Sequence, residues 1–95
     1  MTIYNGEICF VIGGSDSNLN PFQSVSRYNI GKDQWESGTP DLNIARKFAA
    51  ACSLGDTVFV FAGCGVHREH LNSVERINVP AIASSGAAWE LIDLP

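Results

Sequence analysis

Cys64, His67 and His70 form the cluster of this sequence whose residue types come closest to a metal site. A thiolate and two imidazoles at three-residue spacing are ligands that Zn²⁺ accepts if the loop that carries them curls around the ion. A tetrahedral site needs a fourth ligand. The alternative interpretation, a solvated loop that contacts a partner, is favoured, and we expect no metal.

Asp16, Asn18 and Asn20 begin like a calcium loop, but Pro21 stands where such a loop requires glycine and Arg27 where it requires glutamate. Calcium binding by that route is therefore excluded. Ser15 and Ser17 have no nearby histidine with a carboxylate to orient it, and Cys9 and Cys52 lie in apolar segments typical of core cysteines. We therefore expect no catalytic residue and no cofactor.

Composition limits the partners of this chain. Its 95 residues are 45% hydrophobic and 17% charged, which is typical of a folded protein. A net charge of −4 without a cluster of basic residues argues against nucleic acid, and no apolar run reaches the roughly 20 residues of a membrane span. Three cysteines make an odd number, which favours reduced thiols in the cytosol or nucleus, and we expect a cytoplasmic protein.

The elements that position these residues belong to an internal repeat. A shift of 49 residues places residues 6–30 on residues 55–79 with eight of 25 pairs identical. Ser15, Asn18 and Pro21 then match Cys64, His67 and His70, so the candidate zinc ligands are not repeated. The two tryptophans, Trp35 and Trp89, recur at a shift of 54.

Each copy reads as strands, because short β-branched and aromatic segments alternate with Gly, Asn, Asp and Pro. Glycine-containing turns at 30–33 and 54–56 predict hairpins. The expected strands are Glu7–Ile12, Val25–Asn29, Gln34–Ser37, Phe48–Ser53, Thr57–Phe61, Val74–Asn78 and Trp89–Ile92.

The repeated residues resemble the kelch family of β-propellers. Gly13 and Gly14 match its di-glycine, Arg27 and Tyr28 its third strand, and Trp35 its spaced tryptophan. In the second copy Gly63, Arg76 and Trp89 take these positions, whereas Ala62 and Ile77 depart from the pattern. The resemblance implies an all-β fold of two four-stranded antiparallel kelch blades, part of a larger propeller.

We expect structural roles for the residues that recur. The glycines are interpreted as points where neighbouring blades approach too closely for a side chain. The aromatic residues are expected to be buried between blades, and the two arginines to bond carbonyls or a carboxylate across blades. The motif residues assigned to this scaffold are Gly13, Gly14, Arg27, Tyr28, Trp35, Gly63, Arg76 and Trp89.

Loops that follow the second strands, together with the connection between the copies, are expected at one face of the blades. Polar loops on a rigid scaffold are where binding specificity usually resides. The residues expected there are Asp16, Asn18, Asn20, Arg46, Lys47, His67, Arg68, Glu69 and His70. Kelch proteins commonly capture protein segments with this face, so the resemblance implies non-catalytic protein binding or scaffolding. The basic residues would suit an acidic partner segment.

An alternative remains that this chain is part of a kelch-type propeller enzyme, an oxidase or a sugar-processing protein, whose catalytic groups lie in other blades. The expected units are residues 1–46, a first repeat with a truncated innermost strand, and residues 47–95, a second repeat. Because repeat arrays need about three units to bury their faces, we expect further kelch blades in a parent chain or self-association.

Overall fold

The computed structural model describes residues 2–83 and 86–93 and contains two antiparallel sheets of four strands each, joined by residues 37–49. We call them the first and the second blade, and residues 37–49 the linker. In each blade the strands lie side by side in sequence order. The first blade consists of β1 (Thr2–Tyr4), β2 (Ile8–Ile12), β3 (Val25–Asn29) and β4 (Gln34–Glu36). The second consists of β5 (Ala50–Leu54), β6 (Thr57–Phe61), β7 (Ser73–Asn78) and β8 (Glu90–Asp93), with a short 3-10 helix, η1 (Pro80–Ala83), before β8.

The structure confirms the predicted all-β class and the pair of four-stranded blades. β3 and β6 have the predicted bounds, and the other expected strands differ by one or two residues at their ends. Phe48 lies outside β5, because the chain turns there with a φ of 58° before the strand begins. β1, which the sequence predicts as a truncated innermost strand without stated bounds, has three residues, against five in the equivalent β5. The described residues include no helix long and apolar enough to cross a membrane.

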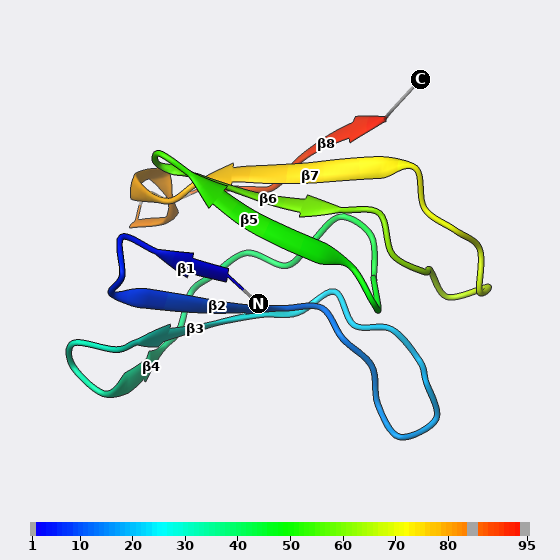
Figure 1. The fold of residues 1–95 in the computed structure, drawn as a ribbon, viewed down its shortest axis with the longest axis horizontal. Coiled ribbons are helices and arrows are strands. Elements are labelled where there is room, and N and C mark those ends of the chain that lie inside the picture. The colour runs from blue at the N-terminus through cyan, green and yellow to red at the C-terminus, as the bar shows by residue number, and fades with distance from the viewer. Residues whose placement is uncertain (1, 84–85, 94–95) are drawn as a thin grey trace.

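The innermost strands β1 and β5 lie beside each other, and the outermost strands β4 and β8 lie apart (Figure 1). The core lies between the blades. From the first blade it receives Tyr4, Phe10 and Val25, and from the second Val58, Val60, Ile77 and Trp89. Leu42 of the linker also belongs to it, as do Val79 and Ile82 from the segment between β7 and β8. Because side chains alternate along a strand, each blade has one face in this core and one facing away.

Candidate functional site

The loops after β2 and β6 are joined through the linker. Arg46 pairs with Phe22 of the first loop, and Lys47 pairs with Cys64 of the second, each as an antiparallel bridge. The nitrogen of Gly14 also donates to the carbonyl oxygen of Arg46 at 2.9 Å. Both loops leave the blades at the same side, opposite the β3–β4 hairpin (Figure 1). The three segments expected at one face therefore do come together, with the linker between the two loops.

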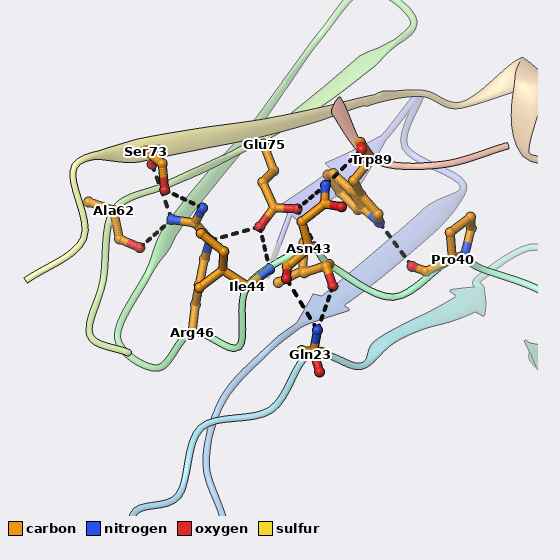
Figure 2. A network of polar contacts seen from close by, with 10 residues as sticks. Gln23, Pro40, Asn43, Ile44, Arg46, Ala62, Ser73, Glu75 and Trp89 are labelled. Atoms are coloured by element: carbon orange, nitrogen blue, oxygen red, sulfur yellow. Dashed lines mark hydrogen bonds and ion pairs between the residues drawn. The ribbon is translucent and has the colours of Figure 1, made fainter. Parts of the chain in front are cut away.

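Arg46 does not belong to the exposed face, and the prediction that it is displayed there is wrong. Its side chain is 0% exposed and forms an ion pair with Glu75, whose side chain is also 0% exposed, at 3.1 Å between Nε and Oε2 (Figure 2). Nη1 donates to the carbonyl oxygens of Ala62 and Ser73, and Nη2 to Ser73 Oγ. The physical reason is that the linker enters the core, where this guanidinium has protein partners instead of water.

Glu75 receives donors from the linker as well as from Arg46. The backbone nitrogens of Asn43 and Ile44 donate to its two oxygens at 2.5 and 3.2 Å, and Asn43 Nδ2 donates to Oε1 at 3.0 Å. Asn43 Nδ2 also donates to the carbonyl oxygen of Trp89 (Figure 2). A buried carboxylate is tolerated only when it is paired and hydrogen-bonded. This network fixes the linker on β7.

Lys47 is also buried, so its predicted display at the loop face is wrong too. Its Nζ donates to the carbonyl oxygen of Leu19 at 2.7 Å. The ammonium therefore holds the tip of the first loop against the linker. Sequence reasoning placed both basic residues in solvent because a polar linker segment resembles a solvated loop when the partners of its side chains are unknown.

Asp16 organises the first loop. Its carboxylate accepts hydrogen bonds from the backbone nitrogens of Asn18 and Asn20 and from Asn20 Nδ2, at 2.8 to 3.1 Å. The bonds from Asn20, together with that from Asn18 and the nearby Lys47, lower the pKa of the Asp16 carboxyl. Asn18 and Asn20 are exposed. The loop therefore has an ordered base and a polar tip.

The second loop carries the remaining predicted contact residues. His67, Arg68, Glu69 and His70 are all exposed. Glu69 Oε2 accepts a hydrogen bond from the backbone nitrogen of His67 at 3.1 Å. Within residues 2–83 and 86–93, no three His, Cys, Asp or Glu side chains are placed to hold a metal ion. The chemistry that this loop offers is polar surface contact.

The glycines lie against the linker backbone. A Cβ at Gly13 would lie 2.5 Å from the carbonyl oxygen of Arg46, and one at Gly63 2.7 Å from that of Lys47. Both have positive φ, as does Gly14, around which space is open. Ala62, the counterpart of Gly13, keeps a φ of 53°. Gly13 and Gly63 thus allow the linker to cross both strand ends closely.

The repeated arginines contact the linker in the first copy and their own blade in the second. Arg27 Nη2 donates to the carbonyl oxygen of Ser37. Arg76 forms two hydrogen bonds with Glu90 on β8, at 2.9 and 3.2 Å, and both side chains are exposed. The contacts across blades that we expected of these arginines are instead made by Arg46 of the linker.

The two tryptophans differ in their exposure and in their contacts. Trp89 is 4% exposed, and its Nε1 donates to the carbonyl oxygen of Pro40 in the linker at 2.9 Å. Trp35 is 65% exposed and packs against Tyr28 in an edge-to-face arrangement, with ring centroids 5.1 Å apart. The expectation that Trp35 is buried between blades is wrong for this chain, because its side of the first blade carries no other blade among the described residues.

Two polar contacts in or beside the core, one of Tyr4 and one of Glu75, were not predicted. Tyr4 Oη donates to Asp56 Oδ1 at 2.7 Å, and this hydrogen bond raises the pKa of the phenol. Glu75 had been seen only as part of a strand. The sequence does contain a signal for its burial. Glu75 and Ile77 are two residues apart on one strand, so their side chains lie on the same face, and the apolar Ile77 indicates that this face is in the core.

Two four-stranded sheets of the same topology, related by a sequence repeat and packed face to face, define a pair of β-propeller blades. A family model described as "Kelch motif" matches residues 3–41 and 45–80. The chain belongs to the kelch-repeat family.

Curated relatives carry the same repeats in much longer chains. Kelch-like protein 36 of Rattus norvegicus and that of Mus musculus are each 28% identical over 89 residues, which are 93% of this chain and 14% of the relative. Kelch-like protein 8 of Mus musculus is 32% identical over 68 residues, 72% of this chain and 10% of the relative. The chain thus spans only a small part of the length of these relatives.

Proposed function

We propose that the two blades bind a protein partner, without catalysis, through the loops that follow β2 and β6. The observation that carries this proposal is the way the loops are built. Their bases are fixed to one linker by its buried residues Arg46 and Lys47, whereas their polar tips are exposed. Rigid support with exposed polar tips lowers the entropy lost on binding. The proposed contact residues are Asp16, Asn18, Asn20, His67, Arg68 and His70.

An acidic partner segment is the finer part of the proposal. Arg46 and Lys47 are already engaged inside the protein, so the attraction must come from Arg68 and its two histidine neighbours. A guanidinium recognises carboxylates through two parallel hydrogen bonds, and its contribution at an exposed site decreases with salt. The proposed site is therefore smaller than the sequence predicts and centred on the second loop.

The first prediction tests this site with immobilised acidic, neutral and basic peptides as probes. We expect the acidic peptides to be retained by the chain and released as salt rises. We expect Arg68→Ala to weaken retention about tenfold, the lower end of the range for a hydrogen bond to a charged group. Lys32→Ala is the matched control, because Lys32 is an exposed cation in the β3–β4 turn at the opposite end of the blade. If the two substitutions weaken retention equally and leave the melting temperature unchanged, the acidic-partner proposal is wrong.

A scaffolding role in the cytoplasm, with kelch blades of the parent chain or of another copy beside these two, completes the proposal. Two uncovered apolar blade faces and three free cysteines support it.

A further inference from the structure

Both blades carry apolar side chains on the faces that point away from the shared core. The open face of the second blade has a hollow of about 380 Å³ with an apolar lining. It is lined by Cys52, Leu54, Phe59, Phe61, Val74 and Ile92. Leu54 is 74% exposed there. Such apolar surface in a small protein marks an interaction site.

The open face of the first blade is apolar as well. By strand alternation, Cys9, Val11 and Tyr28 point away from the shared core, and Trp35 is paired with Tyr28. Ile3 is paired with Cys9 and lies on the same face. Ile3, Val11 and Trp35 are exposed.

The repeat shows that the two open faces correspond to the two surfaces that pack against each other between the blades of one chain. Under the shift of 49 residues, Phe59 and Val74 of the second blade match Phe10 and Val25 of the first. Phe10 and Val25 are buried against the second blade. The open face of the second blade is therefore the same kind of surface as the covered face of the first.

The other half follows from the repeat as well. Val58 and Val60, which cover the first blade, match Cys9 and Val11 on its open face at the shift of 49 residues, and Trp89 matches Trp35 at the shift of 54. The open face of the first blade is thus the same kind of surface as the covered face of the second. One chain presents both complementary surfaces at its opposite ends.

We propose that a second copy of this chain docks head to tail, with the open face of its first blade on the open face of the second blade. This inference is independent of the loop-face function. The interface would continue the one between the blades, in the same direction and with equivalent side chains. Heterologous contacts of this kind form rings when the rotation closes and open chains when it does not.

Charge supports docking without a covalent linker. Glu75, on the covered face of the second blade, needs Arg46 of the linker as its partner. On the first blade Ser26 stands at the matching position. A second copy that covers this face therefore buries no carboxylate that lacks an arginine, which would be costly.

The second prediction tests the direction of docking with two variants that break opposite faces. Leu54→Glu places a carboxylate on the open face of the second blade, and Trp35→Glu places one on that of the first. Both residues are highly exposed, so folding does not depend on them. We expect each variant to weaken self-association of the full chain about tenfold or more, because a carboxylate would be buried without a partner. Val66→Glu, an exposed apolar residue of the second loop, should leave association unchanged.

Mixing the two variants separates head-to-tail docking from a symmetric pair. Each variant keeps one intact face, and these two faces are complementary, so the mixture should form a 1:1 heterodimer and nothing larger in analytical ultracentrifugation. If either variant alone dimerises as the parent chain does, one face binds its own copy and the proposal is wrong. A parent chain that stays monomeric up to about 1 mM, the weakest useful affinity, would also overturn it.

The three free cysteines supply a readout within the unmodified protein. Cys52 and Cys9 lie on the two open faces, whereas Cys64 lies at the base of the second loop. As the protein concentration rises, Cys52 and Cys9 should react more slowly with a maleimide, and Cys64 at a constant rate. Protection of Cys64 alone would place the contact at the loops and contradict the proposal.

Discussion

The two ion pairs of the second blade occupy its two opposite faces. Arg46 and Glu75 are completely buried on the covered face, and four donors converge on the glutamate. Arg76 and Glu90 form two hydrogen bonds on the open face, where their side chains are 44% and 61% exposed. One pair is part of the core and connects three segments, whereas the other joins two neighbouring strands in water.

The difference shows that a neighbouring blade, more than the residue type, decides whether a side chain of these blades is buried and which partners it has. Trp35 and Trp89 teach the same lesson, because the same residue at matching positions is exposed in one blade and buried in the other. Substitutions at matched positions can therefore measure how much a neighbouring blade contributes.

The largest effect is expected at the buried pair. Glu75→Ala leaves the guanidinium of Arg46 and two linker amides without their acceptor inside the core. Removing one partner of a buried ion pair typically costs about 3–5 kcal/mol. We expect a loss of that size in the free energy of unfolding, measured by urea denaturation.

Ser26→Ala provides the matched control in the first blade. Ser26 is exposed, and its substitution should change the free energy of unfolding by less than about 0.5 kcal/mol. Similar losses for the two substitutions would mean that the linker network does not depend on the buried charge.

A smaller effect is expected where the linker crosses the first blade. Gly13→Ala must move the carbonyl of Arg46 as well as adopt a positive φ, and we expect a cost of about 2–4 kcal/mol. Gly14→Ala meets no atom within 4 Å and should cost only about 1–2 kcal/mol for its backbone conformation. Thermal melting of the two variants checks the order, and a larger loss at Gly14 would show that close approach is not the reason for the glycine.

The smallest effect is expected at the exposed pair. Glu90→Gln removes the charge but keeps the shape, and it should destabilise the chain far less than Glu75→Ala. Arg76 lowers the pKa of the Glu90 carboxyl, so its stabilisation is present above the ordinary carboxyl pKa and is lost as pH falls through the lowered value. Urea denaturation of the parent chain and of Glu90→Gln between about pH 3 and 6, the range of carboxyl titration, should converge at the acidic end. A gap that widened on acidification would contradict this sign.

The fold was predictable because its signals are local. Short apolar segments and the turns at 30–33 and 54–56 determine the strands, and the repeat determines how many strands each blade has. The positions of the two loops follow from strand order alone, and Asn18, Asn20, His67 and Arg68 are exposed there, whereas Asp16 is half-buried at the base of the first loop.

The burial of the linker side chains could not be predicted from local signals. Whether Arg46 and Lys47 lie in solvent depends on Glu75 and on the carbonyl of Leu19, which are distant in sequence. The prediction that Trp35 is buried is wrong for a related reason, because its burial requires a blade that the described residues do not contain. Local patterns specify strands, whereas burial between strands is set by non-local partners.

The linker has a consequence for how the protein opens. Connections between repeats are usually the first sites at which backbone amides exchange with solvent and proteases enter. Here the amides of Asn43, Ile44 and Arg46 donate to acceptors in or beside the core. Their hydrogen exchange should require the blades to separate, so the segment between the repeats would report the global stability of the pair.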